Sequence, residues 1–147
     1  MTAPASIPTI QAPVVNTADI KKRFLAAGNA ACVDRYNQNL RVAQQVGFDP
    51  NQNDFAREMA FTEGSLDVAD QLVTRISGLE RPPGDEQRIE TMMGYLARST
   101  VTMRSAIDNY KRFGPQSPGF QQDLDEAADL ERKFNTAAAV YGLQKCA

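Results

Sequence analysis

Carboxylates are the side chains of this sequence that could support chemistry, because the chain of 147 residues contains no histidine. Without histidine, Ser-His-Asp and Cys-His nucleophiles, histidine zinc sites and the Glu-x-x-His di-metal pattern of helical bundles are excluded. Acid–base catalysis would need two carboxyl groups in different environments beside a pocket. The candidates are Glu58, Glu63, Glu86 and Glu90, and nothing in their spacing indicates that they face inward. We therefore expect no enzyme, no catalytic residue and no cofactor.

Five acids between residues 123 and 131 are the candidate cation site: Asp123, Asp125, Glu126, Asp129 and Glu131. A calcium loop needs Asp-x-Asp-x-Asp-Gly in a turn. Here apolar residues interleave with the acids at helical spacing, and the acids lie in the first half of their helix, where the macrodipole favours negative charge. We expect a mostly solvated helix face and no metal site.

Methionines and tyrosines form the candidate ligand site. The six residues are Met59, Met92, Met93, Tyr95, Met103 and Tyr110. Methionine side chains adapt to varied apolar partners, but at helical spacing they more often fill a core. The alternative is a site for a lipid-like or aromatic molecule between helices, lined by these six residues.

Basic residues give a candidate cationic face, composed of Arg88, Arg98, Arg104, Lys111 and Arg112. Arg98 and Arg104 are six residues apart, so they do not share a strict helical stripe. A solvated face is the commoner role for such residues, and docking of an anionic partner is the alternative. The 16 basic and 18 acidic residues give a net charge of −2, so we do not expect nucleic acid as a partner.

Apolar residues at spacings of three and four predict four helices that would position these groups. The first helix is expected from Asn16 to Gly47. The second follows the Asp49-Pro50 turn, has Asn53 as its cap and ends at Gly78. The third is expected from Asp85 to Gly114 and the fourth from Ser117-Pro118 to Gly142. Gly28 and the polar run 37–39 weaken the first stripe and allow a kink or a late start. No segment alternates with period two, so the chain is expected to be all-α.

Four helices of similar length with short connections predict an antiparallel, up-down-up-down four-helix bundle over residues 16–147. Polar residues interrupt the stripes at Asn39, Ser99, Thr100 and Thr102. Buried polar groups need partners, and a polar layer of this kind can fix the register of the helices.

Residues 1–15 contain three prolines and no charged side chain, which predicts a disordered, flexible arm or tether. The segment lacks the basic start and long apolar stretch of a signal peptide. Two interpretations stay open: a native cytoplasmic start, or a start that replaces a removed signal or a membrane anchor upstream of residue 1. No apolar run approaches the roughly 18 residues that span a bilayer.

The two cysteines, Cys32 and Cys146, favour export. Cys146 lies one residue from the end of the sequence, where an exposed free thiol would be reactive. An even number of cysteines in an exported protein predicts one disulfide. The bundle geometry permits this bridge if residues 142–147 fold back along the helices. Two unrelated thiols are the alternative.

The two ends of the chain loosely resemble a group of uncharacterised exported or lipid-anchored actinobacterial helical-bundle proteins. The matching positions are Ala30-Ala31-Cys32 and a terminal Gly-Leu-x-x-Cys formed by Gly142, Leu143 and Cys146. The resemblance implies export and a disulfide between these cysteines, and it implies no particular activity.

These features predict a non-catalytic, secreted or cell-envelope binding or interaction module that is stapled by one disulfide and is a monomer or weak dimer. Its partner is an unknown protein or an apolar ligand. The alternative is a carrier or sensor domain that binds an apolar small molecule between its helices.

Overall fold

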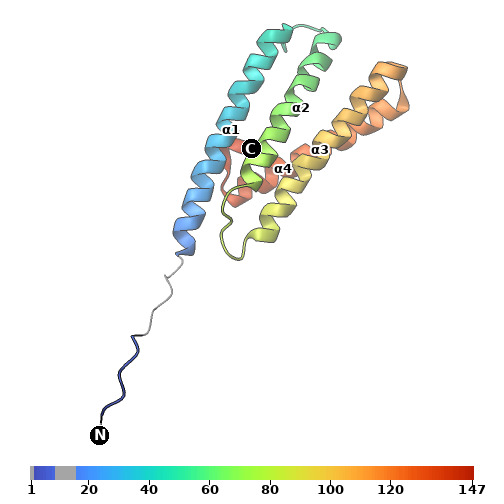
Figure 1. Ribbon diagram of the computed structural model, residues 1–147. Coiled ribbons are helices and arrows are strands. Elements are labelled where there is room, and N and C mark those ends of the chain that lie inside the picture. Colours follow the sequence, from blue (N-terminus) through green and yellow to red (C-terminus); the bar gives the residue numbers. More distant parts are fainter. Residues whose placement is uncertain (1, 9–15) are drawn as a thin grey trace.

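Four α-helices joined by short loops make up the computed structural model, which describes residues 2–8 and 16–147 (Figure 1). Helix α1 spans Thr17–Val46, α2 Phe55–Ser77, α3 Glu86–Phe113 and α4 Pro118–Tyr141, and a short 3₁₀ helix, η1, spans Gln144–Cys146. Successive helices run in opposite directions in Figure 1, and no strand occurs in the described residues. The predicted all-α four-helix bundle is confirmed.

Local capping explains where the helices begin and end. The Asn16 side chain accepts hydrogen bonds from the first turn of α1, and the Ser117 hydroxyl does the same for α4, directly before Pro118. Gly47 and Gly142 follow these helices with φ of 70° and 111°, a backbone conformation that favours glycine. The sequence predicted all four of these ends.

Two details of the helices differ from expectation. The cap of α2 is Asp54 and not Asn53, because the Asp54 carboxylate accepts the Arg57 N–H at 3.1 Å. Helix α1 is continuous from Thr17 to Val46, so it has no late start at Gly28.

The main hydrophobic core occupies the half of the bundle in which α1 begins and α4 ends. It contains residues of all four helices and η1, with Phe24, Ile76, Leu96, Phe134 and Leu143 among its most deeply buried side chains. A smaller cluster lies toward the other end and comes from α2, α3 and α4 alone: Met59, Leu66, Ala106, Ile107 and Phe120. Helix α1 therefore leaves the shared core after its first half.

The C-terminal tail fills the space between α1 and α4, whose Cα atoms nowhere lie within 8 Å of each other. Leu143 is fully buried there, and a Cβ atom on Gly28 would lie 2.6 Å from its Cδ2 atom. Cys146 forms a disulfide with Cys32, with 5.1 Å between their Cα atoms. The predicted bridge and the folded-back tail are both confirmed.

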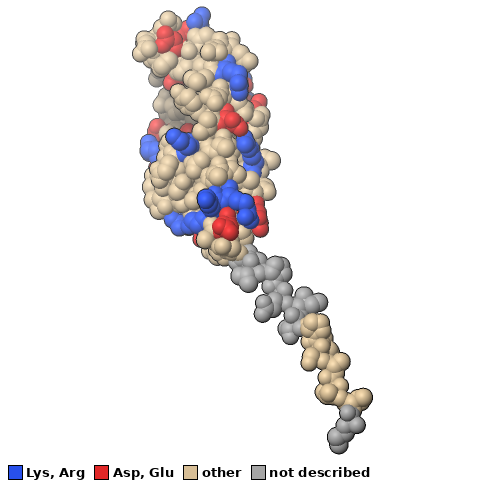
Figure 2. All heavy atoms as spheres, turned by 90° about the vertical axis from the view of Figure 1, so that its left-hand side faces the viewer, with Lys and Arg blue, Asp and Glu red and all other residues tan. Residues whose placement is uncertain are grey.

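The end of the molecule at which α1 begins carries charges of both signs. Blue and red side chains gather together there in Figure 2. Lys21 pairs with Asp85 at 3.5 Å, and Arg23 pairs with Glu80 at 3.5 Å. This end is therefore not a uniformly basic surface.

Residues 2–8 of the predicted arm are exposed and form no helix or strand. The rest of the arm, residues 1 and 9–15, lies outside the described residues. Among the helices that the structure describes, none combines the length and the apolar character needed to cross a bilayer.

Candidate functional site

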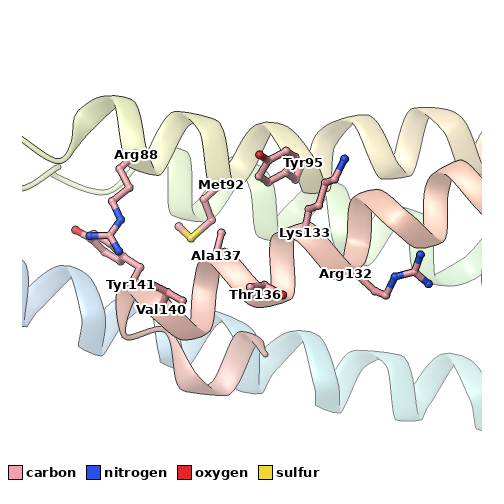
Figure 3. A pocket seen from close by; sticks show the side chains of 9 residues that line it. All are labelled: Arg88, Met92, Tyr95, Arg132, Lys133, Thr136, Ala137, Val140 and Tyr141. Carbon is pink, nitrogen blue, oxygen red and sulfur yellow. The ribbon is translucent and has the colours of Figure 1, made fainter.

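A groove of about 480 Å³ lies between α3 and α4 (Figure 3). Helix α3 contributes Arg88, Met92 and Tyr95, which recur at spacings of four and three along one helix face. Helix α4 contributes Arg132, Lys133, Thr136, Ala137, Val140 and Tyr141. The groove is thus formed where the two most closely packed helices of the bundle face solvent.

The floor of the groove is apolar and belongs to the main core. Met92 is 2% exposed, and in Figure 3 its side chain points from α3 toward Ala137 on α4. Tyr141 is buried, and its ring packs edge-on against Phe24 of α1 with 5.8 Å between the ring centroids. Because α1, α3 and α4 all support it, this floor is a preformed surface.

Cations rim this apolar floor. The Arg88 guanidinium lies 5.1 Å from the centroid of the Tyr141 ring, and Arg98, just beyond the groove, lies 5.5 Å from that of Tyr95. In Figure 3 Arg88 and Lys133 stand over the groove, whereas the Arg132 guanidinium points away from Met92. Cation–π attraction holds Arg88 over the Tyr141 ring and Arg98 over the Tyr95 ring.

A carboxylate beside the groove offsets two of these charges. Asp129 contacts both Lys133, at 3.1 Å, and Arg132, at 3.4 Å, and the hydrogen bond from Lys133 is the main reason that the pKa of Asp129 is lowered. No ion pair joins Arg88 or Arg98 to any carboxylate of residues 2–8 or 16–147. The groove therefore has a positive edge that can receive an anion.

Tyr141 closes one end of the groove as a neutral phenol. Its hydroxyl donates a hydrogen bond to Asp85 Oδ2 at 2.8 Å, and Lys21 approaches the same oxygen. Burial, followed by this hydrogen bond, raises the pKa of Tyr141 far above its ordinary value. Tyr141 can thus donate a hydrogen bond at neutral pH but cannot act as a base.

Tyr141 should make the protein less stable at alkaline pH. Its pKa is higher in the folded state than the value of about 10 in an unfolded chain, so the folded state keeps a proton that the unfolded state releases. The resulting stabilisation is complete below about pH 10 and is lost as the pH rises above it. We expect the urea midpoint to fall more steeply between pH 9 and about 11.5 in wild type than in Tyr141→Phe.

Tyr36→Phe is the matched control for this prediction, because Tyr36 is 64% exposed. Lysine titration affects all three proteins over the same range, so only the difference between them reports on the phenol. Equal slopes in wild type and Tyr141→Phe would contradict the prediction.

The six predicted ligand-lining residues do not share one cavity. Met92 and Tyr95 line the α3–α4 groove, and Met93 lies in the main core. Met59, Met103 and Tyr110 lie in or against the smaller core cluster further along the bundle. The space between α2 and α3 is lined by four charged side chains, Glu63, Arg104, Asp108 and Lys111, together with Leu66 and Ile107.

The five predicted cations also divide into two groups. Arg88 lines the groove, and Arg98 lies beside it. Arg104 pairs with Asp67 and Asp70 of α2, and the hydrogen bond with Asp70 is the main cause of its raised pKa. The other two are also paired: Lys111 with Glu63 of α2 and Arg112 with Asp108 of its own helix. Arg104 and Lys111 thus hold α2 against α3.

The four candidate carboxylates have separate surroundings. Glu63 pairs with Lys111, Glu86 accepts the Gly84 N–H at 2.8 Å, and Glu58 and Glu90 are exposed. In the described part of the chain, no three carboxylate or cysteine side chains are grouped so as to hold a metal ion.

The acidic run on α4 is solvated only in part. Asp125 and Glu126 are exposed. Asp123, in contrast, accepts hydrogen bonds from Ser105 and Asn109 of α3. Glu131 pairs with Arg35 of α1 at 3.1 Å. These two acids connect helices because they lie on the flanks of the buried α4 stripe.

Sequence reasoning missed the α4 side of the groove. Lys133, Ala137 and Tyr141 recur at spacings of four and so share one helix face. That signal is present in the sequence, but Tyr141 also fits the end of the core stripe, and Lys133 resembles any solvated lysine. Only the pairing of α3 with α4 identifies this face as one wall of a groove.

Comparison with known proteins adds no functional assignment: no family model, curated protein or solved structure matches this chain. The function of the chain therefore has to be inferred from its own geometry.

Proposed function

We propose that this protein is a non-catalytic, extracytoplasmic binding module whose α3–α4 groove takes a small amphiphile with an anionic head and an apolar body. The observation that carries the proposal is the combination of an apolar floor with a cationic rim in one groove of about 480 Å³. The apolar body would lie on Met92, and the head would contact Arg88 or Lys133. A charge-assisted hydrogen bond to such a head is about twice as strong as a neutral one.

The size of the groove favours a small molecule over a protein partner. Small-molecule sites have volumes of roughly 300–1,000 Å³, whereas a standard protein interface buries about 800 Å² on each partner. From Lys133 to Tyr141 the groove follows eight residues of α4, or about 12 Å at the helical rise per residue. An aliphatic chain or a single ring system fits a groove of this length.

The Cys32–Cys146 disulfide supports the proposed location. Stable disulfides form and persist in oxidising compartments, and they are rare in cytosolic proteins. Both cysteines are buried, which suits a permanent structural bridge.

Decanoate is a suitable probe, and we expect saturable binding by isothermal titration calorimetry of the oxidised full chain. In the double variant Arg88→Gln, Lys133→Gln the dissociation constant should rise at least tenfold, because each charge-assisted hydrogen bond contributes about 1.5–3 kcal/mol. Val140→Asp should weaken binding similarly without unfolding the chain, since Val140 is 71% exposed and lies at the groove.

Arg41→Gln is the matched control, because Arg41 is exposed on α1 and away from the groove. Its affinity for decanoate should equal that of wild type. Equal affinity in the double variant, or no saturable binding at all, would overturn the proposal.

A carrier or sensor of an uncharged apolar molecule is the second candidate function. Met92 favours it, because an adaptable thioether forms the floor of the groove. Decanol distinguishes the two candidates: it should bind more weakly than decanoate to an anion site and equally well to a purely apolar site.

A further inference from the structure

The second half of α1 leaves a polar cleft beside α4 that is separate from the α3–α4 groove. Every buried residue of α1 lies at or before Cys32. The same helix face continues with Arg35 and Asn39, since Gly28, Cys32, Arg35 and Asn39 recur at spacings of four, three and four. Polar side chains thus occupy the positions at which an ordinary bundle would continue its core.

Two cavities meet at these polar side chains, and both are lined by Arg35, Asn39 and Glu131. The first, of about 240 Å³, lies next to the Cys32–Cys146 disulfide. The second, of about 230 Å³, extends inward between the helices as far as Leu96. Each cavity is several times larger than the roughly 30 Å³ that one water molecule occupies.

Two buried polar atoms in this cleft have no hydrogen-bond partner among the described residues: Arg35 Nε and Asn39 Oδ1. The Arg35 side chain is only 17% exposed, and its other contact is the Glu131 carboxylate at 3.1 Å. A buried donor or acceptor without a partner is unfavourable, because it has lost its hydrogen bonds to water and gained none in their place. The neighbouring hydroxyls contact other groups: Ser99 donates to Ala127 O, and the Thr100 hydroxyl lies within hydrogen-bond distance of Asp70 of α2 and of Ala97 O.

We infer that this cleft binds a small zwitterion, and specifically an α-amino acid with an apolar side chain. Arg35 Nε needs an acceptor, which a ligand carboxylate supplies, and Asn39 Oδ1 needs a donor, which a ligand ammonium supplies. The charges of Arg35 and Glu131 cancel, and the further charged side chain in the lining of the outer cavity, Lys145, is exposed to solvent. A ligand without net charge therefore fits better than an anion or a cation.

The inner cavity explains the preference for an apolar side chain. It is lined by Leu66, Leu96 and Met103, none of which lines the outer cavity next to the disulfide. An amino acid whose charged groups contact Arg35 and Asn39 can direct its side chain onto these three residues. Leucine and methionine are therefore the probes of choice.

A purely structural role is the competing explanation. Asn39, Ser99 and Thr100 would then form a polar layer that fixes helix register, with ordered water bonded to the two unpaired atoms. The two explanations differ in one measurable respect, because a water-filled layer gives no selectivity between leucine and its derivatives.

Calorimetry on the oxidised full chain tests the inference with four ligands: leucine, methionine, leucinamide and N-acetyl-leucine. We expect saturable binding of leucine and methionine. Leucinamide lacks the carboxylate and N-acetyl-leucine lacks the ammonium, so each should bind at least tenfold more weakly. Leucine should not change the affinity for decanoate at the α3–α4 groove. The two proposals are therefore tested separately, because binding at one site can be absent while binding at the other is observed.

Two variants remove the proposed contacts and have matched controls on the same helix. Arg35→Lys keeps the charge but removes Nε, and Asn39→Leu keeps the size but removes the carbonyl oxygen; each should raise the dissociation constant for leucine at least tenfold. Arg41→Lys and Asn37→Leu make the same changes at exposed positions and should leave it unchanged.

Nuclear magnetic resonance of the wild type covers the case in which a variant does not fold. Addition of leucine should shift the Arg35 Nε–H and Asn39 side-chain resonances, and addition of leucinamide at the same concentration should not. Absence of leucine binding at millimolar concentration, or equal shifts with both ligands, would overturn the inference.

Discussion

Replacing Cys32 and Cys146 by alanine is expected to lower the free energy of unfolding by about 4–5 kcal/mol. The bridge joins residues 114 apart, and the chain-entropy model assigns about 4.7 kcal/mol to a closed loop of roughly 100 residues. This is a large part of the 5–15 kcal/mol by which a typical domain is stable. Urea denaturation of the oxidised wild type and the double variant measures the difference directly.

Alanine suits this test better than serine, because both sulfur atoms are in buried residues, 3% and 7% exposed. A buried serine hydroxyl without a partner would add its own cost and inflate the effect. Wild type reduced with a thiol reagent is the control and should behave like the double variant. A difference below about 1 kcal/mol would show that the unfolded chain gains little freedom when the bridge is lost.

Loss of the bridge should also release η1 from α1. Apart from the disulfide and Leu143, the tail is held by Asn29, whose side chain accepts the Lys145 N–H at 2.9 Å and donates to the Gly142 carbonyl at 3.4 Å. Hydrogen exchange at Lys145 and Cys146 would report the release, since exchange follows local opening.

Helix ends and the disulfide could be predicted from the sequence because they depend on local signals or on few candidates. Asn16, Gly47, Ser117 and Gly142 act through backbone conformation and hydrogen bonds within a few residues of themselves. With two cysteines, only one pairing exists. Asp54 replaced Asn53 as a cap because adjacent Asx residues compete, and their sequence does not decide between them.

The close approach at Gly28 could not be predicted, because it depends on a residue more than a hundred positions away. In the sequence, Gly28 weakens a helix. In the folded chain it gives Leu143 the space in which to pack, and α1 continues through it unbroken. The local cost of the glycine is thus offset by long-range packing.

The candidate sites illustrate the same limit. Helical spacing shows which residues share a face, but it does not show which helix that face meets. Met92 and Met103 belong to one helix and one stripe, yet Met92 lines the groove with α4 and Met103 lines the inner cavity near Arg35. Likewise, the sequence indicates that Asn39 interrupts its stripe, but only the structure shows that the Asn39 side-chain oxygen has no partner among the described residues.

Leu143→Ala is expected to cost about 2–5 kcal/mol even with the disulfide intact. Leu143 is fully buried in the main core, and truncation of a buried leucine loses both transfer free energy and packing around the cavity that remains. Leu40→Ala is the matched control, because Leu40 is 46% exposed and its truncation should change stability by less than about 1 kcal/mol. Urea midpoints of the oxidised proteins provide the comparison.

A double-mutant cycle then determines whether Leu143 and the disulfide act through the same docked tail. If the bridge holds Leu143 in place, Leu143→Ala should cost less in the Cys32→Ala, Cys146→Ala background, with a coupling energy of about 0.5–3 kcal/mol. Strict additivity would mean that Leu143 stays docked without the bridge. The tail would then be a core element in its own right, and the disulfide would act on the unfolded chain alone.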